Sequence, residues 1–318
     1  MAAVDSNART GPKVEPTGRM RHTPYDGSHP LFRIGLKPLD LHDWIEVDEH
    51  LDFYLKEKQR LAALYPGRTF MAEAGSEAAQ REVRDLIAAH VVRRFPAIYR
   101  RDGNVIDVNG RPVGLDGDEP KLAIAAKLVQ EDLLVLGRDE AGWRLIAGSL
   151  SFPSSWSLGE KFGRAMEDIH APVPGFGAGT RNAAMINRVF DNLKPDQPVW
   201  RMNWSVYADD ELFHDDRTAE HLKKRDLTAG VFLRVEYQTL RLLPESGRIL
   251  FTVRVHVDPM ARLQAHPDRR RISGAFAEQL AGLSAEQLAY KGLTAQRDLL
   301  LERLRAMAET TTGSGALS

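Results

Sequence analysis

Three long segments in the second half of the chain have the residue pattern of β-strands, and they limit the possible folds more than any other feature. They comprise residues 199–207, 231–242 and 248–257. In the first segment large apolar residues alternate with polar ones, so Trp204 and Arg201 belong to opposite faces. The last two segments flank a short turn and predict a hairpin. We therefore expect an antiparallel sheet with helices against it.

The register of this hairpin decides which polar side chains meet. A five-residue loop over 243–247 would place Val235 opposite Val255 and Glu236 opposite Arg254. This register pairs apolar residues with each other and an acid with a base. One interpretation is that the polar face is simply solvated, as is common in antiparallel sheets. The other is that its polar residues line a concavity. These residues are Arg201, Asn203, Arg234, Glu236 and His256.

The remaining pattern predicts an α+β fold, a central antiparallel sheet with flanking helices. Apolar spacings of three and four predict helices over 41–64 and 75–95, and turn signals between 102 and 142 indicate a β-rich stretch with strands at 129–136 and 143–151. Ser157 and Glu160 form a capping box before a short helix over 161–168. Thr180 is expected to cap a helix that runs to about Leu193, with Met185 on its apolar face.

Composition shifts divide the chain into four parts. Residues 1–27 are polar and broken by Gly and Pro, so we expect a disordered tail, and the same holds for 309–318. The main domain is expected to span 28–271. Residues 272–308 predict one or two amphipathic helices, broken near Gly282 or Gly292, that either pack on the sheet or dock a partner. Packing on the sheet is the favoured alternative.

Charge and cysteine content exclude several kinds of function. Lys and Arg number 43 and Asp and Glu 44, a net charge of −1, so there is no basic excess for nucleic-acid binding. The chain has no cysteine, which excludes disulfides, thiolate metal sites, cysteine nucleophiles and iron–sulfur clusters. No apolar run approaches a membrane span or a signal peptide, so we expect no membrane association and a cytoplasmic location.

His170 is the histidine with the strongest case for a role in binding. It follows the capped helix and precedes Ala171-Pro172-Val173-Pro174, a rigid apolar segment that would fix an imidazole against a flat cofactor. The alternative is a histidine that only satisfies the helix end. We expect the other nine histidines to be solvated.

The glycine-rich run at 175–179 precedes a predicted helix and could present backbone amides to an anion such as a phosphate or a propionate. Arg181 and Arg188 are near enough in sequence to assist. A flexible connector explains these glycines equally well, because no complete phosphate-binding motif is present.

Several motifs, in order over roughly residues 30–260, resemble the haem-dependent oxidative N-demethylase family, α subunit. The motifs are Val129-Gln-Glu-Asp-Leu-Leu, Phe152-Pro-Ser-Ser-Trp156, Lys161-x-Gly163, Ile169-His-Ala-Pro-Val-Pro174, Trp200-Arg-Met-Asn-Trp204, Leu233-Arg-Val-Glu-Tyr-Gln-Thr-Leu240 and Phe251-Thr-Val-Arg. The most specific of them is the one that contains His170.

The resemblance implies a PAS-like domain that holds haem b and oxidises a small secondary amine, such as dimethylamine, with O2. Formaldehyde and a primary amine would be the products. Partner reductase subunits carrying flavin and an iron–sulfur cluster would deliver electrons from NADPH, which fits a chain without cysteine.

In the light of the resemblance, His170 becomes the expected axial ligand, with its second ring nitrogen held by a backbone carbonyl near Asp168 or Pro172. Arg201, Asn203 or Arg234 would stabilise negative charge that develops on O2. Glu236, Tyr237 or Trp204 would receive the protonated amine, and Arg181 is a further candidate for cofactor binding. Two alternatives remain: a PAS-type sensor that binds haem or a small ligand without turnover, and a family member that has lost haem.

Overall fold

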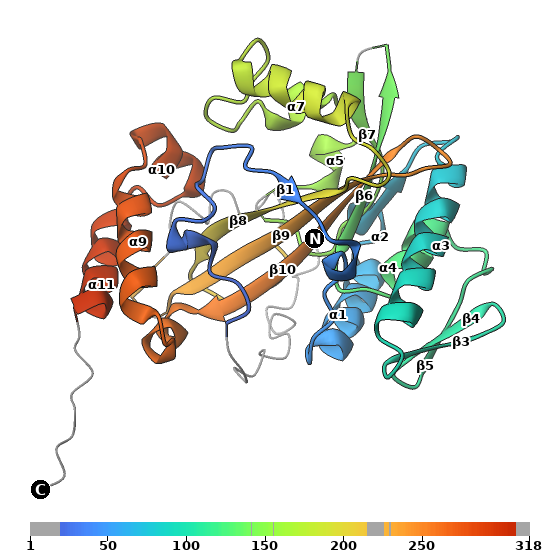
Figure 1. The fold of residues 1–318 in the computed structure, drawn as a ribbon, viewed down its shortest axis with the longest axis horizontal. Coiled ribbons are helices and arrows are strands. Elements are labelled where there is room, and N and C mark those ends of the chain that lie inside the picture. The colour runs from blue at the N-terminus through green and yellow to red at the C-terminus, as the bar shows by residue number, and fades with distance from the viewer. Residues whose placement is uncertain (1–19, 141, 155, 215–225, 229, 310–318) are drawn as a thin grey trace, which may run out of the picture.

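The computed structural model describes residues 20–140, 142–154, 156–214, 226–228 and 230–309 (Figure 1). Its main feature is a seven-stranded antiparallel sheet with the order β1-β8-β9-β10-β6-β7-β2. The strands are β1 (Lys37–Pro38), β2 (Phe70–Ala72), β6 (Asp132–Asp139), β7 (Gly142–Ser149), β8 (Val199–Tyr207), β9 (Phe232–Leu242) and β10 (Ile249–Pro259). The α+β prediction with a large antiparallel sheet is confirmed.

Smaller elements complete the described part of the chain. A three-stranded sheet contains β3 (Tyr99–Asp102), β4 (Val105–Val108) and β5 (Arg111–Gly114). The α-helices are α1 (Leu51–Leu64), α2 (Pro66–Thr69), α3 (Glu77–Arg94), α4 (Lys121–Ala126), α5 (Leu158–Lys161), α6 (Met166–His170), α7 (Arg181–Asp191), α9 (Arg269–Ala281), α10 (Ala285–Lys291) and α11 (Arg297–Glu309). The 3₁₀ helices are η1 (Pro24–Asp26), η2 (Leu41–Asp43) and η3 (Met260–Ala265).

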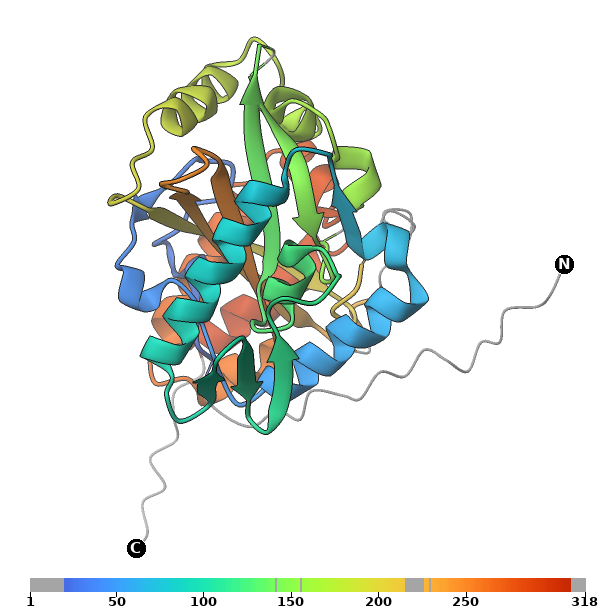
Figure 2. The same cartoon turned by 90° about the vertical axis from the view of Figure 1, so that its right-hand side faces the viewer.

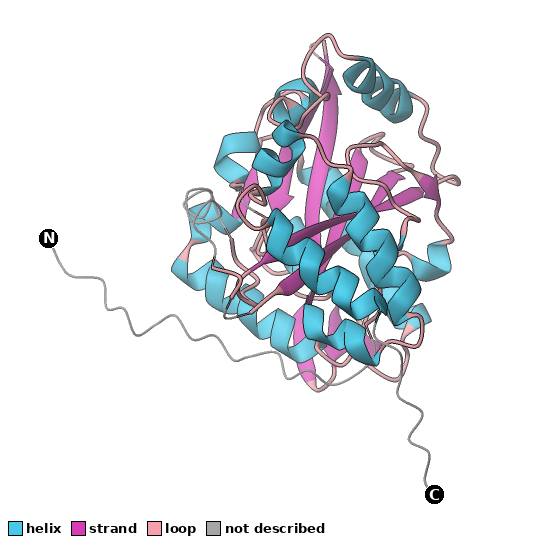
Figure 3. Cartoon of the chain, turned by 90° about the vertical axis from the view of Figure 1, so that its left-hand side faces the viewer, coloured by secondary structure: helices cyan, strands magenta, loops and turns pink. Residues whose placement is uncertain are grey.

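Each face of the large sheet has its own apolar core. One face carries Trp204 and Val235 and packs against α3, α4, α9 and α11. The opposite face carries Val253 and Val255 and packs against α5, α6 and α7, while α1 contributes to both cores. Figure 2 shows α1 and α3 beside the β6–β7 hairpin, and Figure 3 shows the C-terminal helices over the strands toward the other end of the sheet. The favoured packing of the C-terminal helices on the sheet is confirmed.

The three long strands match the predicted segments to within two residues, but the predicted hairpin register is wrong by one position. Glu236 lies opposite Val255, and Tyr237 lies opposite Arg254. The turn is shorter than predicted: the Leu243 N–H donates to the carbonyl of Arg248 at 2.8 Å, which leaves four residues, 244–247, between the paired ends. The predicted pairing of Glu236 with Arg254 is not formed because Asp48, from another segment, pairs with Arg254 instead.

The new register moves His256 to the face of Trp204, away from Arg201, Asn203, Arg234 and Glu236. The prediction that five polar residues share one face is therefore wrong for His256. The other four side chains share the face that α5, α6 and α7 cover.

Several predicted helices are divided. The capping box of Ser157 and Glu160 is confirmed, but it begins the single turn α5, and Gly163, at φ +73°, separates this turn from α6. The predicted helix over 41–64 becomes η2 and α1, and the C-terminal stretch breaks at both predicted glycines instead of one. Met185 is exposed, and the buried residues of α7 are Ala183 and Phe190.

The predicted N-terminal tail is ordered over its last eight residues. Tyr25 is fully buried, with its ring stacked on Phe276 at 4.6 Å and edge-on to Trp204 at 6.4 Å. A single aromatic anchor thus overrides the polar composition of residues 20–27. Residues 1–19 and 310–318 lie outside the described residues, and Glu309 ends α11.

Four histidines that we expected to be solvated are buried: His29, His90, His214 and His256. His90 on α3 packs edge-on against Trp44 at 5.1 Å, and its Nε2 has no hydrogen-bond partner among the described residues. Burial lowers its pKa to about 4. In the unfolded chain the imidazole has its ordinary pKa, so acidification protonates the unfolded state first and destabilises the fold.

We expect His90→Phe to remove this acid sensitivity. Between pH 7 and pH 5 the histidine should cost the wild type about 2 kcal/mol of unfolding free energy, which the variant retains. Urea unfolding of both proteins at the two pH values measures the difference. His42→Ala, which removes an exposed histidine, is the control. Equal pH dependence of wild type and His90→Phe would contradict this prediction.

Candidate functional site

His170 is the last residue of α6, on the face of the sheet covered by α5, α6 and α7. Its Nδ1 lies 2.8 Å from the carbonyl oxygen of Met166. A carbonyl can only accept, so Nδ1 carries the proton and Nε2 keeps its lone pair. The predicted acceptor, a carbonyl near Asp168 or Pro172, is wrong. The acceptor is Met166 because the helical backbone brings the residue one turn earlier under the ring.

The surroundings of His170 favour a neutral imidazole. Burial lowers its pKa, the hydrogen bond to Met166 acts in the opposite direction, and the charges of Arg201 and Lys161 lower it further. The ring of Phe176 lies 6.4 Å away in a tilted arrangement. Neutral imidazole is the form that binds a metal ion.

The apolar core on this face contains side chains that the protein covers only in part. They include Phe162, Ile169, Ile186, Val189, Val199, Phe251 and Val257. Partly covered apolar surface beside a neutral imidazole suits a flat, largely apolar cofactor.

Arg201 on β8 supplies positive charge to the same face. Burial lowers its pKa, whereas Glu236 and Tyr290 favour the charged form. Its Nε is buried and has no hydrogen-bond partner among the described residues. A buried N–H without an acceptor is costly, so this Nε is available to an electron-rich partner.

Glu236 and Asn203 lie side by side on the neighbouring strands. The carboxylate of Glu236 accepts hydrogen bonds from Asn203 Nδ2 at 3.3 Å and from Gln238 Nε2 at 2.7 Å. Lys291 at the end of α10 donates to Asn203 Oδ1 at 3.0 Å, and burial lowers the pKa of Lys291 to about 8. Two cations and one carboxylate thus share this face with His170.

Lys291 was not predicted from the sequence. It lies in a C-terminal helix that the sequence left without a defined position, and nothing in its local pattern separates it from a solvated lysine. Lys161 was also missed: its Nζ donates to the carbonyl of Ile169 at 2.8 Å and so helps to fix the turn that ends in His170. The Lys161-x-Gly163 motif was a signal that could have pointed to this contact.

Arg234 lies on the same face, but its guanidinium forms hydrogen bonds within the protein. It donates to Ser154 Oγ at 2.8 Å, to the carbonyl of Phe152 at 2.8 Å and to the carbonyl of Leu212 at 3.0 Å. It also stacks over Tyr207 at 5.6 Å. Arg234 is only 1% exposed, so it fastens two loops to β9.

We expect Arg234→Met to lower the free energy of unfolding by roughly 3 kcal/mol, because several buried carbonyl groups lose their donor. Chemical denaturation measures the change. Arg100→Met, in which the replaced side chain is 80% exposed, should be nearly neutral. Similar losses in the two variants would disprove the fastening role.

Three predicted site residues lie apart from this group. Trp204 and Tyr237 belong to the opposite face; Trp204 packs edge-on against Phe276 at 4.8 Å, and the Tyr237 hydroxyl donates to the carbonyl of Asp43 at 3.0 Å. Arg181 is exposed at the first position of α7, next to the confirmed N-cap Thr180. The structure therefore groups His170, Arg201, Asn203 and Glu236.

Residues 130–132, which lead into β6, are buried and form hydrogen bonds with other segments. Gln130 Nε2 donates to Asp48 at 2.8 Å, and Glu131 accepts from the backbone N–H of Glu46 at 2.8 Å. Asp132 accepts from the backbone N–H groups of Ser151 and Phe152 at 2.7 and 2.9 Å. This motif is structural.

The chain's membership follows from a comparison of its sequence with known families. A family model described as "Haem-dependent oxidative N-demethylase, alpha subunit-like" matches residues 35–301. The class of protein is therefore a haem-dependent oxidoreductase, which agrees with a neutral imidazole beside partly covered apolar side chains. More narrowly, the chain belongs to the haem-dependent oxidative N-demethylase, alpha subunit-like family.

The described helices were also compared with the requirements of a membrane span. None of them combines the necessary length with sufficient apolar character.

Proposed function

We propose that this chain holds haem b through His170 and carries out oxidative N-demethylation of a small secondary amine of the dimethylamine type. The observation that carries the proposal is the hydrogen bond that holds the proton on Nδ1 of His170 and so leaves Nε2 its lone pair, on a face where the Nε of Arg201 has no hydrogen-bond partner among the described residues. The reaction consumes O2 with a pair of electrons and a pair of protons. It yields formaldehyde, a primary amine and water.

A PAS-like fold is part of this proposal. The hairpin of β6 and β7 is followed by α5, α6 and α7 and then by β8, β9 and β10, with β10 beside β6. This order, with its helices on one face, supports a PAS-like core in which a short helix supplies the proximal histidine. β1, β2 and the C-terminal helices extend that core.

When bound, haem would supply the transfer of electrons to dioxygen. The residues of this chain would position the reactants. Arg201 would stabilise negative charge on the oxygen side, with Asn203 as a second donor. Glu236 would attract the ammonium group of the substrate, and its amide partners Asn203 and Gln238 would fix its orientation. Partner subunits carrying flavin and an iron–sulfur cluster would supply the electrons.

The experiment that tests the function uses the full chain purified from cells supplied with a haem precursor. We expect a Soret band that shifts on reduction with dithionite, and formaldehyde after the protein is mixed with air, dimethylamine and an excess of a chemical reductant that supplies both electrons. Spectral shifts on amine addition without formaldehyde would support the binding-only alternative. Absence of the Soret band would reject haem binding.

We expect Glu236→Gln to raise the KM for the amine by about 10-fold to 100-fold, because a charge-assisted hydrogen bond is worth roughly 1.5–3 kcal/mol. The kcat should change less, since the carboxylate contacts the part of the substrate that carries the charge. Steady-state formaldehyde assays separate the two constants. Glu278→Gln, on the exposed side of α9, is the matched control. An unchanged KM would remove Glu236 from substrate binding.

A further inference from the structure

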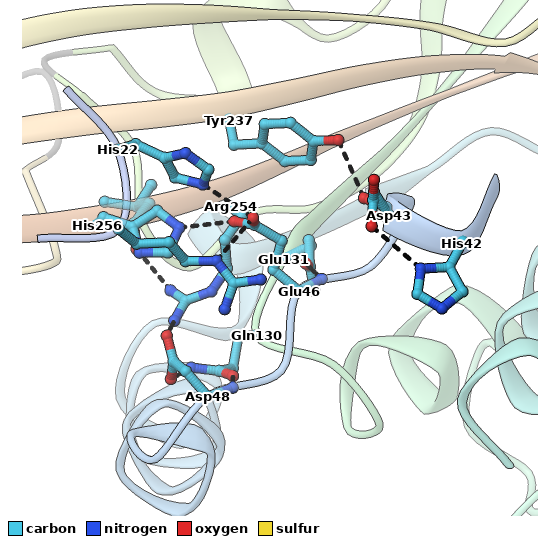
Figure 4. A network of polar contacts seen from close by, with 12 residues as sticks. His22, His42, Asp43, Glu46, Asp48, Gln130, Glu131, Tyr237, Arg254 and His256 are labelled. Atoms are coloured by element: carbon cyan, nitrogen blue, oxygen red, sulfur yellow. Dashed lines mark hydrogen bonds and ion pairs between the residues drawn. The ribbon is translucent and has the colours of Figure 1, made fainter. Parts of the chain in front are cut away.

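A second cluster of ligand-type side chains lies on the face of the sheet that carries Trp204, opposite to the face of Arg201. Figure 4 shows its side chains. It contains His22, from the segment before η1, Glu46, from the segment before α1, and His256 on β10. The ring Nε2 of His22 lies 2.8 Å from Glu46 Oε1, and that of His256 lies 2.8 Å from Glu46 Oε2. One ligand atom from each residue lies within 4.8 Å of the others.

The two imidazoles approach the carboxylate from different directions. Their ring centroids are 5.1 Å apart and their planes meet at 73°, so the two Nε2 atoms converge without stacking. Tyr237 stacks on the outer face of His22 at 5.6 Å with an interplanar angle of 5° and fixes that ring. Two histidines and one carboxylate are a common ligand set for Zn²⁺ and Fe²⁺.

The charge states of these groups suit a cation. Burial lowers the pKa of His256 to about 4, so its ring is neutral near pH 7. Burial alone would raise the pKa of Glu46, but hydrogen bonds from His22 and His256 hold it well below its usual value. The nearby Arg254 carries a positive charge, and Asp48 neutralises it at 2.6 Å.

The second layer around the cluster contains an unpaired acceptor. Glu131 is fully buried and receives the backbone N–H of Glu46 on Oε1 at 2.8 Å, while its Oε2 has no hydrogen-bond partner among the described residues. Arg21 Nε also contacts Glu46 Oε1, at 2.9 Å. Its side chain is 45% exposed, so this arginine can move into solvent when a cation arrives.

The geometry points to a structural site for a divalent transition-metal ion, bound by His22 Nε2, His256 Nε2 and the carboxylate of Glu46. Water would complete the coordination shell. Access is through His22, whose side chain is 16% exposed, compared with 6% for Glu46. The ion would join three segments that lie 24 and 210 residues apart in the sequence, and it would hold the N-terminal segment on the sheet.

Zn²⁺ is the probe for this site, added to the untagged full chain after treatment with a chelator. We expect calorimetry to show one Zn²⁺ per chain, a higher Tm in the presence of Zn²⁺, and slower tryptic cleavage after Arg21. His22→Ala and Glu46→Gln should each weaken binding by at least ~100-fold. Absence of stoichiometric binding by the wild type would overturn the site.

His42→Ala is the matched control, since it removes an exposed histidine next to Asp43. It should bind Zn²⁺ as tightly as the wild type. If His22→Ala and Glu46→Gln also bound as tightly, the ion would be elsewhere and the assignment would be wrong. The Soret band should be the same with and without Zn²⁺, so the result is independent of the proposed function.

Discussion

A His170→Ala variant is expected to purify without the Soret band of bound haem and to release no formaldehyde from dimethylamine. The carbonyl of Met166, 2.8 Å away, holds the proton on Nδ1 of His170. Nε2 therefore keeps its lone pair, on the face that carries Arg201. Alanine removes the ligand atom and leaves a space of about the size of imidazole. Added imidazole should therefore restore part of the absorption band, which spectroscopy with and without imidazole measures.

His266→Ala is the control for this experiment, because His266 lies after η3, away from α6, and its ring Nδ1 accepts from the backbone N–H of Asp268. It should keep both the band and the activity. If His170→Ala had the oxidised and reduced spectra of the wild type, His170 would not be an axial ligand and the proposed haem site would have to be abandoned.

Arg201→Met is expected to lower kcat for formaldehyde release by about 10²-fold to 10³-fold, the usual loss when one donor to a developing negative charge is removed. The same variant should be more stable than the wild type. Burial disfavours the charge of Arg201, and its Nε has no partner among the described residues, so methionine relieves a desolvation cost. Activity assays and thermal unfolding measure the two opposite effects.

Two variants sharpen this prediction. Arg201→Lys keeps the charge and should recover part of kcat, although lysine cannot reproduce the planar donor set. Arg81→Met, on the exposed side of α3, should change neither quantity. A variant Arg201→Met that lost stability and activity together would indicate a structural role, and the assignment of Arg201 to catalysis would fail.

Local patterns predicted much of the fold. The alternation along residues 199–207 correctly separated the face of Trp204 from that of Arg201, and the capping box at Ser157 located the turn that leads to His170. The register of β9 and β10 was not predictable in this way. The groups that pair with Arg254 and His256 lie 206 and 210 residues away in the sequence, so pairing of neighbouring strands carried no information about them.

The candidate site was predictable to a similar extent. His170, Arg201, Asn203 and Glu236 were named from strand faces and a helix end, which are local properties. Lys291 was not, because its position depends on how α10 packs beside the sheet. The contacts of Arg234 were missed for the converse reason: a strand face shows which side a cation occupies, but not that the Ser154 hydroxyl and loop carbonyls already accept hydrogen bonds from it.

The run Gln130-Glu131-Asp132 has a consequence for mutational studies. Gln130 and Glu131 hold the segment before α1, and Asp132 holds the loop after β7, so the run ties both to one end of β6. Damage there would disturb both sides of the sheet at once. A random-mutagenesis screen for activity would thus recover these positions among its most sensitive hits, even though none of them is expected to touch a reactant.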